Sequence, residues 1–220
     1  MIFDPMQAPV IGTDGHLPAV PFDRLTPEGL RARFRTPPVW LPEVRDEPRF
    51  TDRHPSAAAV LVPVVERALP TVLLTERTGH LPTHAGQIAF PGGKVDADDR
   101  DAVATALRES DEEIGLKPEH IEVLGTLPVY TTGTGFIITP VVALVPQHYA
   151  VQPNPGEVAD VFEVPLHFLM NPANHERRET WWDGRHRQWF SMPYREPQRE
   201  RFIWGATAGM LRNFYRFLAA

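Results

Sequence analysis

Residues 108–116, with the sequence RESDEEIGL, constrain this chain more than any other segment. At about 100° per residue, Glu109, Glu112 and Glu113 fall within one arc of a helix, roughly 100° wide. The neighbouring arc carries a mostly apolar stripe at the spacing of a core seam, formed by Val103, Ala106, Leu107, Ser110 and Ile114. We therefore expect a helix that packs this stripe against a core and keeps the carboxylates off the buried side.

Three carboxylates at this spacing repel one another along the helix. Each like-charged pair three or four residues apart destabilises a helix by about 0.2–0.5 kcal/mol, and only Arg108 stands beside them. A hard cation such as Mg²⁺ would reverse that penalty, because Mg²⁺ favours one or two carboxylates together with waters and phosphate oxygens. The cluster indicates either a divalent-metal site for phosphate chemistry or a solvated acidic face, and the acids alone do not separate the two.

A glycine-rich segment precedes the helix and extends the pattern. From Gly93 through Asp99 to residues 108–115, the chain resembles the Nudix box, a family motif of the form Gly, five residues, Glu, seven residues, REUXEEXGU. Here Asp99 fills the glutamate position, eight residues follow it before Arg108, and Ser110 replaces an apolar residue. The coenzyme A pyrophosphatase branch of the Nudix family carries a box of this kind that is one residue longer.

A second signature adjoins the box in register. Residues 73–77 read LLTER and residues 84–93 read HAGQIAFPGG, which resembles the branch signature LLTxR…HxGxxxFPGG. Later blocks of the branch are similar to residues 125–128, 139–142, 157–166 and 204–208, so the resemblance covers roughly residues 55–215. The branch usually has Leu-Arg or Leu-Lys where this chain has Leu81-Pro82, so a cation that could meet a substrate phosphate is missing.

The resemblance implies an α/β Nudix fold, an α/β/α sandwich around a mixed β-sheet. It places the hydrolase domain at residues 55–220, after an N-terminal arm with a short helix and a linker at residues 1–54. Local patterns predict the main elements. We expect helices at 26–35, 99–114, 165–170 and 207–218, strands at 57–65, 71–74, 87–90, 121–127 and 135–145, and a hairpin at 176–192. Asp98 or Asp99 is the expected cap of the acidic helix, and residues 1–22 are expected to be a loosely held arm.

The same resemblance implies a metal cofactor, Mg²⁺ or Mn²⁺. The implied ligands are Glu109, Glu112, Glu113 and the backbone carbonyl of Gly93, where glycine also permits a course that a Cβ could obstruct. Glu112 is counted among the catalytic residues as well. Arg108 is expected to orient the acids rather than to touch substrate; the alternative is a plain surface ion pair, which contributes only about 0–1 kcal/mol.

Other site residues lie outside the box. Arg77, His84 and Gln87 belong to the second signature and are predicted to bind substrate; for Arg77 a structural ion pair is the alternative. Glu157 lies in a loop rich in proline and glycine, and it is predicted to help activate the attacking water, directly or as an extra metal ligand, with a surface carboxylate as the alternative. The tryptophans at 181, 182, 189 and 204 are expected in the core, with a pocket for an adenine ring as the alternative.

The implied activity is hydrolysis of the pyrophosphate bond of coenzyme A, or of an acylated or oxidised form, to 3′,5′-ADP and 4′-phosphopantetheine or its derivative. One alternative is a Nudix pyrophosphatase for another nucleotide, such as ADP-ribose, a dinucleotide coenzyme or a nucleoside triphosphate; Pro82 keeps it open. Another alternative is a non-catalytic Nudix-like nucleotide sensor. The intact acidic trio argues against the sensor, because a binding module has no need of three mutually repelling carboxylates.

Composition agrees with one enzyme domain. A chain of 220 residues with 42% hydrophobic content can bury a full core. The absence of cysteine excludes disulfides and thiolate zinc sites, and it fits a cytoplasmic protein. A net charge of −6 argues against broad nucleic-acid binding. Neither a signal-peptide pattern nor an apolar run of about 18 residues is present, so we expect no membrane partner. Many relatives are dimers, and analogy alone admits a homodimer here.

Overall fold

The computed structural model describes residues 4–49, 51–52, 54–80, 85–182 and 184–220, which form two β-sheets and several helices. The larger sheet has eight strands: β2 (Ser56–Val65), β3 (Thr71–Arg77), β4 (Ile88–Ala89), β5 (Gly92–Lys94), β6 (Glu122–Thr126), β7 (Tyr130–Thr131), β8 (Phe136–Val145) and β9 (Val158–Pro165). The smaller sheet has four: β1 (Val10–Thr13), β10 (Glu176–Trp182), β11 (Arg185–Arg195) and β12 (Glu200–Trp204). The α-helices are α1 (Phe22–Leu25), α2 (Pro27–Arg35), α3 (Ala102–Ile114), α4 (Leu166–Leu169) and α5 (Gly205–Ala219). Short 3-10 turns are η1 (Pro5–Gln7), η2 (Pro118–His120) and η3 (Pro172–Asn174).

Strand β2 is the centre of the larger sheet. It runs parallel to β8 and antiparallel to β3 and β5, so the sheet is mixed, as predicted. Alternate side chains of β2 enter two different cores, with Ala59 and Leu61 on one face and Val62 and Val64 on the other. This near-continuous apolar run is typical of a strand that is covered on both faces.

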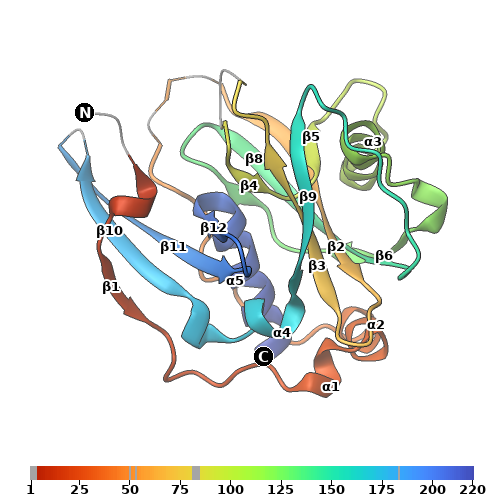
Figure 1. Cartoon of the computed structure of the whole chain (residues 1–220), viewed down its shortest axis with the longest axis horizontal. Helices are drawn as coiled ribbons and strands as arrows, with labels where there is room; N and C mark the ends of the chain where they lie inside the picture. Colours follow the sequence, from red (N-terminus) through yellow and green to blue (C-terminus); the bar gives the residue numbers. More distant parts are fainter. Residues whose placement is uncertain (1–3, 50, 53, 81–84, 183) are drawn as a thin grey trace.

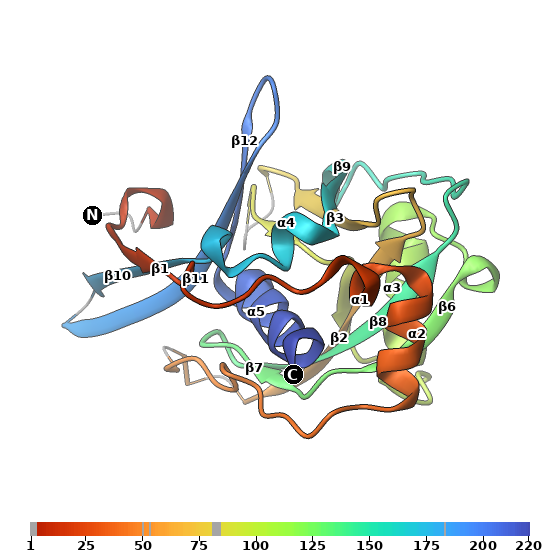
Figure 2. The same cartoon turned by 90° about the horizontal axis from the view of Figure 1, so that it is seen from below.

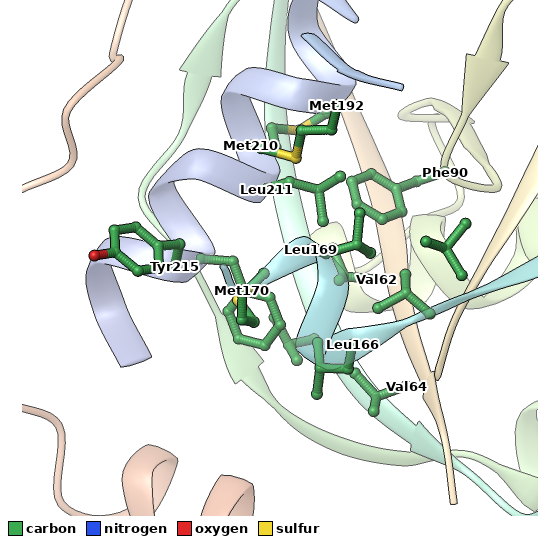
Figure 3. Packing of buried hydrophobic residues seen from close by; sticks show 14 of the residues in the cluster. Val62, Val64, Phe90, Leu166, Leu169, Met170, Met192, Met210, Leu211 and Tyr215 are labelled. Carbon is green, nitrogen blue, oxygen red and sulfur yellow. The ribbon is translucent and has the colours of Figure 1, made fainter. Parts of the chain in front are cut away.

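Helices cover both faces of that sheet, with α3 on one side and α5 on the other (Figure 1). On the α5 side, Met210 and Leu211 pack near Phe90 and Leu169 in the larger of the two cores (Figure 3). The predicted α/β sandwich is therefore confirmed. Among the described residues, no helix is long and apolar enough to cross a membrane.

Helix α3 begins at Ala102, three residues later than predicted. Its N-cap is Asp101, whose side chain accepts a hydrogen bond from the Ala104 N–H at 2.8 Å, whereas Asp99 is engaged by Arg108 instead. The prediction of Asp98 or Asp99 as the cap was therefore wrong, because a competing arginine holds Asp99. The helix ends at Gly115, whose φ of 68° lies in the left-handed region that glycine adopts without steric penalty.

The smaller sheet extends beyond the predicted hairpin. Strands β10 and β11 pair as expected, but β12 joins one side and β1 joins the other (Figure 2). Residues 1–22 were predicted to be a loosely held arm, and the structure differs because β1 pairs with β10. The Arg178 guanidinium reinforces that pairing by donating to the carbonyls of Met6 at 3.0 Å and Ala8 at 2.7 Å. The Thr26 cap of α2 is as predicted, with its side chain accepting from the Gly29 N–H at 3.0 Å.

Candidate active site

The acidic side of α3 is less exposed than the helical wheel predicted. The side chains of Glu112, Glu109 and Glu113 are 59%, 18% and 5% exposed, respectively. The expectation that all three carboxylates lie off the buried side was therefore wrong for Glu113. The reason is β5, which passes over this side of the helix and directs the Gly92 N–H to Glu113 Oε2 at 3.0 Å.

Burial of carboxylates without a full counter-charge changes their protonation. Burial raises the pKa of Glu113 to about 7, although the Gly92 N–H and the Arg77 cation oppose the shift. Burial also raises the pKa of Glu109, against the hydrogen bond from Arg108. The charge of Glu157 contributes to both shifts, so it lies within electrostatic reach of both helix carboxylates. These groups therefore form one coupled anionic cluster, which a cation would stabilise.

Glycine is required where β5 meets the cluster. A Cβ on Gly93 would lie 2.4 Å from the Glu109 carboxylate, and a Cβ on Gly92 would lie 2.4 Å from the carbonyl oxygen of Ala59. Gly92 also has a φ of 153°, which L side chains rarely adopt. The Gly-Gly pair therefore lets the backbone pass directly against the acids, as the sequence predicted for Gly93.

Arg108 connects the box residues to one another. Its guanidinium donates to Glu109 Oε1 and Glu112 Oε2, both at 3.1 Å, and to the carbonyl of Lys94 at 3.1 Å. It also bonds both oxygens of Asp99, at 3.0 and 2.8 Å, and this pairing holds the pKa of the Asp99 carboxyl well below its usual range. Arg108 thus orients two helix acids while Asp99 fixes Arg108 from the preceding loop.

The loop at residues 152–157 is attached to the end of α3. The N–H of Asn154 donates to the Glu113 carbonyl at 2.8 Å, and the N–H of Gln152 donates to the Ile114 carbonyl at 2.7 Å. The carbonyl of Glu157 accepts from the Thr78 N–H at 2.9 Å. These backbone bonds bring a half-buried Glu157 to the acidic cluster, as the sequence predicted.

The second-signature residues separate into two environments. Arg77 Nη1 lies 3.6 Å from Glu113 Oε1, and Arg77 Nε is buried without a hydrogen-bond partner among the described residues. Gln87 is the backbone neighbour of Arg77, with the Arg77 N–H donating to its carbonyl at 3.0 Å. Gln87 also lines a cavity on the α5 side of the larger sheet. His84 and Pro82 lie outside the described residues.

Sequence reasoning did not place that cavity. It has a volume of about 520 Å³, and its walls come from the linker after α2, the smaller sheet and the start of α5. Trp189 and Trp204 are half-buried and line it, and Trp181 is 73% exposed, so the expectation of core tryptophans was wrong for these three. The side chain of Trp182 lies outside the described part of the structure. The only signal in the sequence was the number of tryptophans near the C-terminal end, which does not say which of them share a pocket.

The donor set fits a hard divalent cation without forming a closed cage. Across residues 4–49, 51–52, 54–80, 85–182 and 184–220, no three acidic or histidine side chains are gathered as a ready metal site. The charge of Glu109 nevertheless helps to raise the pKa of Glu113, and the Gly93 backbone passes against Glu109. Mg²⁺ needs only one or two carboxylates, the rest being water and substrate phosphate. The residues present therefore fit such an ion.

Comparison with known proteins gives concordant results. The family model for the NUDIX domain matches residues 53–191. A protein of Citrobacter koseri described as an uncharacterized Nudix hydrolase NudL is 44% identical over 157 residues, covering 71% of this chain and 79% of that protein. A protein of the same description from Salmonella heidelberg is 43% identical over 191 residues, covering 86% and 93%.

Among solved structures, a C. elegans Ap4A hydrolase in a binary complex is 24% identical, with a TM-score of 0.44 over 54% of this chain and 85% of that chain. A MutT/nudix family protein from Enterococcus faecalis is 18% identical, with a TM-score of 0.47 over 76% and 63%. The family model spans more than half of the chain, and the residues that it covers include both signatures and the acidic helix. The chain therefore belongs to the Nudix family and is a pyrophosphohydrolase that acts on a nucleotide-like substrate.

Proposed function

We propose that this Nudix hydrolase cleaves the pyrophosphate bond of coenzyme A or its acyl derivatives, releasing 3′,5′-ADP and 4′-phosphopantetheine or its acyl form. One observation carries the proposal. The two signatures meet at Glu113, which accepts from Gly92 at 3.0 Å and lies 3.6 Å from Arg77. The segment that resembles the coenzyme A branch is thus built into the acidic site of the box.

Nudix hydrolases generally require divalent metal ions. We propose Mg²⁺ or Mn²⁺, held by Glu109, Glu112, Glu113 and the Gly93 carbonyl. When bound, such ions neutralise charge on the substrate phosphates and lower the pKa of a bound water.

The remaining catalytic functions belong to side chains of this chain. Arg108 positions Glu109 and Glu112 through its 3.1 Å hydrogen bonds. Arg77 binds a phosphate oxygen of the substrate. That oxygen accepts a hydrogen bond from the guanidinium of Arg77, whose buried Nε has no other partner among the described residues. Glu157 accepts the proton of the attacking water. Its side chain is half-buried beside the acids, and backbone hydrogen bonds hold its loop in place. A general base of this kind contributes about 10²–10⁴-fold to the rate.

Two alternatives from the sequence differ in what they require. A pyrophosphatase for ADP-ribose, a dinucleotide coenzyme or a nucleoside triphosphate would use the same acids, so substrate comparison separates it from our proposal. A nucleotide sensor would have no use for a cluster in which neighbouring carboxylates raise the pKa of Glu109 and Glu113. The division of the chain near residue 54, a cytoplasmic location and a homodimeric state stay predictions.

A panel of substrates tests the proposal. The protein is incubated with coenzyme A, acetyl coenzyme A, ADP-ribose, a dinucleotide coenzyme and a nucleoside triphosphate, each with Mg²⁺ or Mn²⁺, and products are identified by mass spectrometry. We expect coenzyme A to be cut faster than ADP-ribose. If ADP-ribose or the triphosphate is cut ten times faster, the substrate assignment fails while the family assignment stands.

A further inference from the structure

The cavity of about 520 Å³ on the α5 side of the larger sheet has no part in the chemistry described above. Its volume falls within the range of about 300–1,000 Å³ that is usual for small-molecule sites. Its walls include Glu47, Gln87, Tyr130, Trp189 and Trp204. The indole rings of Trp189 and Trp204 lie 6.3 Å apart in an edge-to-face arrangement, so one wall is a broad aromatic surface.

The cavity adjoins the acidic site through one pair of residues. The Arg77 N–H donates to the Gln87 carbonyl at 3.0 Å where β3 ends, and the Arg77 guanidinium lies 3.6 Å from Glu113. Gln87 itself lines the cavity. On the far side, the Thr207 hydroxyl of α5 donates to the Ile88 carbonyl at 3.0 Å, which fixes β4 against the helix. Arg77 and Gln87 therefore connect the acidic site to a wall of the cavity.

Charge on the walls decides which half of the substrate belongs there. Three acids, Glu43, Asp46 and Glu47, line the cavity against two arginines, Arg177 and Arg187. Arg177 is already paired, at 2.9 Å each, with Asp14 and Glu43. Glu47 is held as an acceptor by the Tyr130 hydroxyl at 2.7 Å and the Gly133 N–H at 2.9 Å. Carboxylates on these walls would therefore repel a phosphate-bearing group, whereas an uncharged group meets no such repulsion.

We propose that this cavity binds the uncharged pantetheine arm of the substrate together with any acyl group on its sulfur; this inference rests on the proposed function. The arm carries amides, which need hydrogen-bond partners once they are buried, and the walls carry amide side chains that can exchange partners with them. Gln188 Nε2, for example, donates to the Glu179 carboxylate at 3.0 Å in the absence of a ligand. The acyl chain is apolar and gains from contact with the two indoles. The 3′,5′-ADP half stays on the other side of the diphosphate.

One substitution can obstruct the cavity without removing a core residue. Gln188 lines the cavity and is exposed, so Gln188→Trp adds bulk at its mouth; Gln147→Trp makes the same change at an exposed position outside the cavity and is the matched control. We measure kcat and KM for coenzyme A, for acyl forms of increasing length, and for ADP-ribose, which lacks the pantetheine arm. Binding of free pantetheine is followed separately by tryptophan fluorescence.

For wild type we expect KM to fall as the acyl chain lengthens, by up to about fourfold per buried methylene. Gln188→Trp should raise KM for coenzyme A and its acyl forms at least tenfold, leave KM for ADP-ribose within twofold, and abolish the pantetheine signal. An equal rise for ADP-ribose, or no change for any substrate, would overturn the inference. If coenzyme A is not cut at all but pantetheine still binds wild type and not Gln188→Trp, the proposed function fails and the pantetheine site stands.

Discussion

The two faces of the larger sheet treat buried charge in opposite ways. On the α3 face, Glu109 and Glu113 are buried enough for their pKa values to rise, and the charges of neighbouring carboxylates add to both shifts. On the α5 face, Asp14 and Arg212 are also buried, but they pair at 2.9 Å. Burial raises the pKa of Asp14, yet the hydrogen bond from Arg177 and the charge of Arg212 bring it below its ordinary value.

The histidine on the α5 face is kept neutral. Burial lowers the pKa of His175 to about 4, and its ring bonds the Leu169 carbonyl at 2.7 Å and Arg212 at 3.1 Å. Every charge in that group therefore has a partner, and the group holds the linker, the smaller sheet and α5 together. A buried charge with a complete set of partners indicates a structural role, whereas a cluster that resists its own ionisation indicates a site that takes a ligand.

The largest effect on this contrast is expected from Glu157→Gln. Loss of the proposed base should reduce kcat by about 10²–10⁴-fold, with a smaller change in KM, because the substrate contacts remain. Steady-state kinetics with coenzyme A would measure both. A loss below fivefold would assign proton transfer elsewhere, with a glutamate of the box as the next candidate.

On the α5 face the expected effect is on folding and not on chemistry. Arg212→Met leaves Asp14 and Glu43 without the guanidinium that now bonds them at 2.9 and 2.7 Å. Breaking such a buried pair on one side should lower the free energy of unfolding by about 3–5 kcal/mol. Urea unfolding would measure the change in this free energy. Arg216→Met is the control, because Arg216 is exposed and lies 3.9 Å from Glu43, farther than Arg212 does. Equal stabilities for the two variants would show that the network contributes little.

Local patterns predicted the elements that hold the site, and long-range contacts decided the rest. The stripe of α3 and the Thr26 cap depend on residues within one or two turns, so the sequence alone reveals them. Burial of Glu113 depends on β5, which a helical wheel does not include. The pairing of β1 with β10 joins Val10 to Arg178, far apart along the chain, and a four-residue strand gives little warning of it.

The residues of the site show the same difference between local patterns and long-range contacts. Motif spacing predicted that Arg108, Glu109 and Gly93 would lie together, because a strand, a loop and a helix that follow one another bring them there. The proximity of Glu157 came from the family resemblance and is realised by backbone bonds to α3 and β3 that no local pattern encodes. The cavity was not predicted, since its walls come from segments between residues 11 and 209.

Glu113→Gln tests whether the uncompensated charge on the α3 face serves catalysis. The variant keeps the shape of the side chain and removes one anionic ligand, so we expect kcat to fall by at least about 10²-fold. The melting temperature without metal should stay the same or rise, because an unfavourable buried charge is gone. Glu119→Gln, an exposed change just after the same helix, is the control. Near-normal turnover in a folded variant would show that Glu113 is not part of the metal site. In a separate experiment, EDTA should stop the wild-type reaction.

The smallest expected effect is a pH dependence of stability that differs in sign between the two faces. In the metal-free protein Glu113 has a pKa of about 7, above its value of 4.5 in an unfolded chain. Between those values the folded state binds more protons, so this residue lowers stability as pH rises, by roughly 3 kcal/mol across the window. His175 acts in the opposite direction, because its folded pKa of about 4 lies below its ordinary 6.5, so its contribution grows as pH rises from 4 to 6.5.

Comparison of variants separates these two contributions. With EDTA present, the difference in unfolding free energy between Glu113→Gln and wild type should be small at pH 5 and should grow to pH 8 in favour of the variant. Adding Mg²⁺ at pH 8 should stabilise wild type more than the variant, because the ion binds the folded carboxylate. A difference that stays constant with pH would show that Glu113 is already compensated in the absence of metal, and the contrast between the two faces would then be lost.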